Sequence, residues 1–114
     1  MLESLNSSLY KGYYNDKLCV YQEKDGIVVG LTNVYAKDGY GKYYQLEISI
    51  LNKTGTFITI YPEDVTAYLK DGEAIKELKV YTFQLKGGKK VQLALNEELE
   101  KIVKIVYRGK MEFR

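Results

Sequence analysis

The fold is decided by the stretch KDGYGKYYQLEISILNKTG, residues Lys37–Gly55, which contains the most regular strand pattern of the chain. Apolar and polar side chains alternate in it, with Tyr44, Leu46, Ile48 and Ile50 separated by Gln45, Glu47 and Ser49. A period of two residues is typical of a β-strand that buries one face. We therefore predict a strand that begins after the glycine-containing turn KDGYGK and ends at the turn NKTG.

Seven further segments have strand character, because they are rich in the Val, Ile, Thr, Tyr and Phe residues that suit a pleated, half-buried surface. They are KLCVYQ (17–22), GIVVGLTNVYA (26–36), TFITIY (56–61), VTAYL (65–69), ELKVYTFQL (77–85), KVQLAL (90–95) and IVKIVYRG (102–109). Turn-forming Gly, Asn, Asp or Pro residues separate them. We predict one domain, residues 1–114, folded as an all-β antiparallel sandwich of about seven or eight strands.

Two segments also carry helix signals. Pro62–Gly72 has a proline suited to a first helical position, acids in the first turn and a glycine stop, yet we predict a strand in it. Asn96–Arg108 begins with a capping asparagine and two glutamates. For this segment we predict a helical turn over Asn96–Lys101 and then a strand. If both segments were helical, the fold would be α+β.

The composition excludes several kinds of reaction centre. The chain contains no histidine and one cysteine. Ser-His-Asp and Cys-His catalytic groups, histidine zinc sites and thiolate metal cages therefore cannot be built from this chain alone. No stretch matches the acidic pattern of a calcium loop. We predict no metal, no cofactor and no enzymatic activity; the remaining enzyme hypothesis uses carboxylates alone.

The charge balance argues against whole classes of partner. Seventeen basic and fifteen acidic residues give a net charge of +2, which is too balanced to indicate nucleic-acid binding. No apolar run approaches the roughly 20 residues of a membrane-spanning helix. We therefore predict no nucleic-acid partner and no membrane span.

Two glycine-lysine motifs resemble phosphate-binding loops but lack the required context. A Walker A loop needs Ser or Thr after its lysine and a helix next, whereas Tyr43 follows Lys42 and a strand comes next. The motif GGKK also precedes a strand, so we interpret Gly87 and Gly88 as positive-φ residues of a tight hairpin turn. We interpret the sequon at Asn52 as a turn rather than a glycosylation site.

Twelve tyrosines make recognition through aromatic rings the main binding hypothesis. If every strand runs the full height of the sandwich, successive connections lie at alternate ends. Tyrosines and lysines then gather at one end, where rings beside cations could bind a peptide, a glycan or an anionic surface. The predicted ligand- or partner-binding residues are Tyr13, Tyr14, Tyr40, Lys42, Tyr43, Lys89 and Lys90.

The run GKYYQLEISILNKTGTFITIYPEDVTAYLKDG, Gly41–Gly72, resembles bacterial cell-envelope immunoglobulin-like sandwich domains of Bacteroidetes type. In these domains a Y-x-L-x-I-x-I-x-N strand precedes a glycine turn, a short strand, a proline and a further strand that ends in Asp-Gly. The resemblance implies an immunoglobulin-like sandwich in the periplasm or at the cell surface; a complete chain without a leader would be cytoplasmic. It transfers no catalytic residue.

These observations predict a non-catalytic domain that acts in assembly or recognition. The alternative is a ligand-binding module for a peptide, a glycan or an anionic surface, which would use the end rich in tyrosine and lysine. A protein or glycan partner is compatible with both, and edge strands could pair between two copies to form a homodimer.

Overall fold

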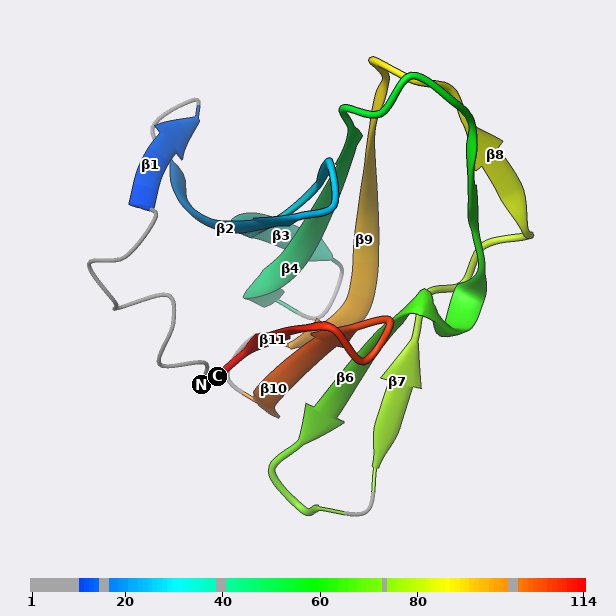
Figure 1. The fold of residues 1–114 in the computed structure, drawn as a ribbon. Coiled ribbons are helices and arrows are strands. Elements are labelled where there is room, and N and C mark those ends of the chain that lie inside the picture. The colour runs from blue at the N-terminus through cyan, green and yellow to red at the C-terminus, as the bar shows by residue number, and fades with distance from the viewer. Residues whose placement is uncertain (1–10, 15–16, 39–40, 73, 99–100) are drawn as a thin grey trace.

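The described part of the chain is built almost wholly from antiparallel β-strands. In this computed structural model it comprises residues 11–14, 17–38, 41–72, 74–98 and 101–114. The strands form three sheets, and the element order includes one short 3₁₀ helix, η2 (Pro62–Asp64). The prediction of an all-β, sandwich-like fold is confirmed (Figure 1).

The largest sheet has five strands, and its first four follow one another along the chain. In order across the sheet they are β1 (Lys11–Tyr14), β2 (Lys17–Lys24), β3 (Ile27–Asp38), β4 (Gly41–Asn52) and β9 (Lys90–Glu98). β3 and β4 pair along their whole length, from Ile27 opposite Asn52 to Asp38 opposite Gly41. β9 returns from a distant part of the sequence to pair with β4.

A four-stranded sheet and a two-stranded ribbon complete the fold. The strands of the four-stranded sheet, in order, are β11 (Met111–Phe113), β10 (Ile102–Tyr107), β6 (Val65–Leu69) and β7 (Ile75–Glu77). The β5–β8 ribbon consists of β5 (Ile58–Ile60) and β8 (Phe83–Leu85). It lies at one side of the molecule, between the two sheets in the path of the chain (Figure 1).

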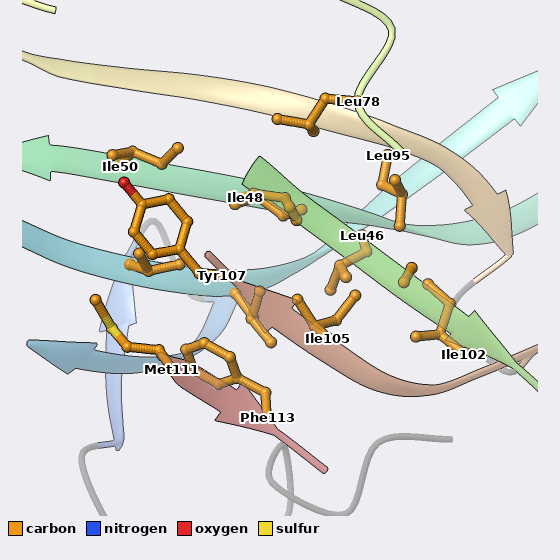
Figure 2. Packing of buried hydrophobic residues seen from close by; sticks show 14 of the residues in the cluster. Leu46, Ile48, Ile50, Leu78, Leu95, Ile102, Ile105, Tyr107, Met111 and Phe113 are labelled. Carbon is orange, nitrogen blue, oxygen red and sulfur yellow. The ribbon is translucent and has the colours of Figure 1, made fainter. Parts of the chain in front are cut away.

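Side chains from the two larger sheets meet in one hydrophobic cluster. Leu46, Ile48 and Ile50 of β4 are fully buried, as the alternation in the opening stretch predicts. They face residues of the four-stranded sheet such as Ile105 and Phe113 (Figure 2). The cluster also includes Ile60 and Leu85 from the ribbon, so all three sheets share the core.

The structure settles both segments that carried helix signals. Pro62–Asp64 form a single 3₁₀ turn and β6 follows over Val65–Leu69, so the predicted strand is confirmed. The helical turn predicted over Asn96–Lys101 is wrong for its first half, because β9 continues as a strand to Glu98; residues 99–100 lie outside the described residues, and Lys101 has 3₁₀-helical conformation. Glu98 pairs with Gln45 beyond a register shift in β4, and this tertiary pairing overrides the local capping signal. The α+β alternative is therefore wrong for the described residues.

The described residues form eleven strands, more than the seven or eight expected. The segment ELKVYTFQL, predicted as one strand, contributes to two: Glu77 ends β7, and Phe83–Leu85 form β8. Between them, the residues from Leu78 to Thr82 leave one sheet and reach the ribbon. β1 and β11, at opposite ends of the chain, were not predicted.

The side chain of Asn52 joins the end of β4 to the ribbon. Its Nδ2 donates hydrogen bonds to the carbonyls of Thr56 at 2.8 Å and Leu85 at 2.9 Å. Its Oδ1 accepts hydrogen bonds from the backbone N–H of Thr54 at 2.9 Å and from the Thr54 hydroxyl at 2.6 Å. The amide is fully buried, and all its hydrogen-bonding capacity is used.

Two glycines shape the turn next to this junction, and they do so for different reasons. Gly88 has a φ of +81°, as the third residue of a turn closed by the Lys89 N–H on the Lys86 carbonyl. Gly87 does not have positive φ, so that part of the hairpin interpretation is wrong. Instead, a Cβ at Gly87 would lie 2.5 Å from the carbonyl oxygen of Thr54. The turn also links two different sheets rather than the strands of one hairpin.

Substitution of Gly87 by alanine tests this close approach. Gly87→Ala should lower the free energy of unfolding by about 1–3 kcal/mol, because backbone must move to admit the methyl group. Gly55→Ala is the matched control: a Cβ at Gly55 meets nothing within 4 Å, so its effect should stay within about 0.5 kcal/mol. Urea unfolding of both variants measures the difference, and equal shifts in midpoint would contradict the steric argument.

Tyr107 of β10 buries its ring in the core and leaves its hydroxyl without a hydrogen-bond partner. Figure 2 shows the ring among the buried side chains of the hydrophobic cluster. Burial raises the pKa of Tyr107, and the positive charge of Arg108 only partly opposes this effect. The folded chain therefore keeps the proton at pH values where the unfolded chain loses it. The stability that results is present below the ordinary pKa and is lost as the pH rises.

Tyr107→Phe should raise the free energy of unfolding by about 1 kcal/mol at neutral pH, because it removes an unpaired buried polar group. It should also reduce the loss of stability above about pH 10, where tyrosine normally ionises. Tyr81→Phe is the control, since Tyr81 is 95% exposed. Thermal unfolding at neutral and alkaline pH measures both effects, and a destabilised Tyr107→Phe would show that the hydroxyl has a partner.

Candidate functional site

The structure places four of the predicted site residues in one half of the five-stranded sheet. Tyr13 and Tyr14 lie in β1, where Tyr14 pairs with Lys17 at the start of β2. Lys42 and Tyr43 lie at the start of β4, paired with the end of β3. The backbones of these residues therefore approach the same end of the sheet. Tyr40 lies outside the described residues.

The predicted grouping is wrong for Lys89 and Lys90. Lys90 pairs with Leu51 near the end of β4, so it lies at the opposite end of the sheet from Tyr43. The Asn52 N–H also donates to the Lys89 carbonyl. The prediction assumed that every strand spans the sandwich, but the strands between β4 and β9 are short and three of them have three residues each.

The sequon at Asn52 is not an exposed acceptor for a glycan. A glycan would be joined to Nδ2, and both protons of this atom already bind carbonyls. The interpretation of Asn52 as a turn residue is confirmed, because its Oδ1 accepts the N–H two residues ahead.

Among the residues whose side chains are described, exposed aromatic rings gather on the β5–β8 ribbon and the segment before β8. Ile60 and Leu85 point into the core, whereas Phe57 and Tyr61, on either side of β5, are 59% and 43% exposed. Tyr81, just before β8, is 95% exposed. Across the ribbon, Gln84 is exposed and pairs with Thr59. We call this surface the ribbon face and define it by Phe57, Thr59, Tyr61, Gln84 and Lys86.

Sequence reasoning missed the ribbon face because both sides of TFITIY look apolar. The alternation of Phe57 and Tyr61 with Ile58 and Ile60 predicts a strand, but it does not say which side is buried. The threonine at position 59 is the one polar signal for an outer side. It is too weak to separate the two faces without the tertiary structure.

A shallow hollow adjoins the ribbon face next to Phe57. It has a volume of about 160 Å³ and is lined by Thr54, Gly55, Thr56, Phe57, Lys86 and Gly87. Binding sites for drug-sized molecules usually measure about 300–1,000 Å³. The hollow is therefore suited to a single side chain of a partner rather than to an enclosed small molecule.

A partly buried ion pair attaches the other end of the ribbon to the four-stranded sheet. The Nη2 of Arg108 lies 2.8 Å from Oδ2 of Asp64, and this carboxyl is 8% exposed. The same oxygen accepts the N–H of Tyr61 at 3.0 Å, while Arg108 also donates to the carbonyl of Thr59. The hydrogen bond to Asp64 is the main cause that raises the pKa of Arg108, so the guanidinium is charged.

A second hollow, of about 430 Å³, lies where β6 turns into β7. It is lined by Leu69, Lys70, Asp71, Ala74, Lys76 and Lys101. Three lysines against one carboxylate could hold a small anion. However, the carboxylate of Asp71 already accepts the Ala74 N–H, and Lys101 also takes part in another interaction.

The described residues contain no group of three acidic, cysteine or histidine side chains placed to hold a metal ion. No helix among the described residues is long and apolar enough to cross a membrane. No family model matches the chain, and comparison with curated proteins and with solved structures found no match either. A function for this chain therefore has to be inferred from its exposed side chains and hollows.

Arg108→Ala tests how firmly the ion pair holds the ribbon. We expect it to lower the free energy of unfolding by about 1–2 kcal/mol, less than the roughly 3–5 kcal/mol of a fully buried pair, because Arg108 is partly exposed. Lys110→Ala, an exposed change in the same turn, should have almost no effect. Hydrogen exchange should show faster opening of the Tyr61 amide in Arg108→Ala, and unchanged exchange there would contradict the attachment.

Proposed function

We propose that this chain is a non-catalytic recognition domain that binds a partner protein through the ribbon face. The observation that supports this most directly is the exposure of Phe57 and Tyr61 on a ribbon whose other side is core. Aromatic residues are enriched in protein interfaces because they bury much area at little entropic cost. The nearby Tyr81 extends the aromatic surface.

The attachments of the ribbon support the same function. Asn52 holds one end of it and the Asp64–Arg108 pair holds the other. A surface that is ordered before binding loses less conformational entropy on binding. The ribbon face thus has both the side chains and the rigidity that recognition of a protein requires.

The proposal includes a location in the periplasm or at the cell surface, which rests on the resemblance of Gly41–Gly72 to envelope domains. A glycan is less well suited as the ligand, because the hollow beside Phe57 is small and the chain has no tryptophan to stack on a sugar. Tyr13, Tyr14, Lys42 and Tyr43 form a second candidate surface, supported by the convergence of their backbones at one end of the sheet.

Site-specific photo-cross-linking in the native host tests the ribbon face. A photoreactive phenylalanine analogue at Phe57 should give one discrete protein adduct. The same analogue at Val103 should give none, although Val103 is also exposed, at 40%, on β10 of the four-stranded sheet. Addition of Tyr61→Ala should weaken the Phe57 adduct several-fold without unfolding the chain. Equal adducts from positions 57 and 103 would refute the proposal.

A further inference from the structure

The outer edge of β8 presents backbone groups that have no strand partner. Among the described strands, β8 pairs with β5 alone. The Thr59 carbonyl on β5 points out of the ribbon to Arg108, which identifies Thr59 and Gln84 as a non-hydrogen-bonded pair. In such a pair the N–H and C=O of both residues point away from the partner strand. Those of Gln84 therefore face the outer edge of β8.

Two other edges of the fold, those of β5 and β11, each have an outward carbonyl bound by a side chain. Arg108 closes the edge of β5 at Thr59. Gln22, from the five-stranded sheet, donates to the Glu112 carbonyl at 2.8 Å and closes the edge of β11. Within the described residues, no side chain binds the backbone of Gln84 or Thr82 in this way. Natural proteins usually protect such edges from pairing with another chain.

The sequence around β8 is basic. Between Lys76 and Lys90 it has five lysines and one glutamate, although Lys76 belongs to β7 and Lys90 to β9. Lys79 and Lys86 flank β8, and both are exposed. The edge thus combines free hydrogen-bonding groups, a fully exposed ring at Tyr81 and an excess of positive charge.

We propose that the edge of β8 binds an extended acidic segment of a partner protein, which adds to the ribbon as a third strand. This inference rests on the proposed function and names the partner's chemistry. Backbone hydrogen bonds to Gln84 hold such a strand, while side-chain contacts set its specificity. Tyr81 packs on its side chains, and Lys79 and Lys86 attract its carboxylates. A second copy of this chain fits less well, because antiparallel pairing of two β8 edges would bring these lysines together.

Binding of synthetic capped peptides to the isotope-labelled chain tests the proposal. The probe is a peptide of alternating glutamate and threonine. One control has lysine in place of glutamate; the other keeps the glutamates but has an N-methyl group on every residue, so neither of its edges can donate to a strand ladder. Fluorescence anisotropy measures affinity, and amide shifts locate the contact. The acidic peptide should bind at least tenfold more tightly than either control and should shift the Thr82 and Gln84 amides.

Three variants locate the interaction. Gln84→Pro removes an outward N–H that β5 does not use, so it should keep the fold and weaken binding at least tenfold. Tyr81→Ala should weaken binding about tenfold. Ile75→Ala is the matched control, because Ile75 is 55% exposed on β7, away from the ribbon; it should leave affinity unchanged. If Gln84→Pro fails to fold, the N-methylated peptide decides the same question.

The outcomes separate this inference from the proposed function. Unchanged affinity in folded Gln84→Pro or equal binding of the N-methylated peptide overturns strand addition, and equal binding of the lysine peptide overturns the acidic character of the partner. Dimerisation that Gln84→Pro abolishes, seen by sedimentation velocity, assigns the edge to a second copy and also overturns the inference. A Phe57 cross-link that persists in any of these cases would leave the ribbon face as a recognition surface.

Discussion

The saturated amide of Asn52 is the constraint on which the arrangement of the three sheets depends. It ends the longest strand pair of the molecule, yet its four side-chain hydrogen bonds go to the following turn and to β8. A buried amide that lost these partners would leave several polar groups unpaired, each at a cost of about 1–3 kcal/mol. The turn after β4 and the start of the ribbon therefore adopt one geometry relative to the core.

The position of the ribbon explains why rings can remain exposed there. Ile60 and Leu85 supply its share of the core, while Asn52 and the Asp64–Arg108 pair hold its two ends. The side chains on the outer side of the ribbon do not belong to the buried core. Phe57 and Tyr61 can therefore stay at the surface without loosening the fold, as a recognition surface requires.

The sequence predicted the parts of the fold that local patterns control. The alternation in β4 predicted its buried residues, and VTAYL coincides with β6. It did not predict that ELKVYTFQL divides between two sheets, or that Asn96–Glu98 extend β9. These outcomes depend on pairing between distant segments. The predicted positions of Lys89 and Lys90 were wrong for the same reason. The prediction assumed that each strand crosses the full height of the sandwich, and the sequence alone cannot reveal that the four consecutive strands β5 to β8 are short.

The ribbon face was missed for a different reason. Tyrosine and lysine content indicated recognition, but the sequence did not single out Phe57, Tyr61 or Tyr81, which are exposed. Whether a side of TFITIY is exposed depends on which side meets Leu85 and the core, and this is a property of the assembled fold. What the sequence did contain was the local excess of lysine around β8, whose meaning is clear only beside an open edge.

The lysines around β8 have two physical consequences that favour one kind of partner. An open edge with exposed aromatic rings promotes pairing between identical chains, and lysines on such edges oppose it by like-charge repulsion. The same charges attract a strand that carries carboxylates, so a single feature both disfavours self-association and selects an acidic partner. Edges closed by Gln22 and Arg108 need no such charge, because their outward carbonyls are already bound. The edge of β8 thus combines free backbone groups with an exposed lysine on each side of the strand, which is the combination expected of an edge kept open for a different chain.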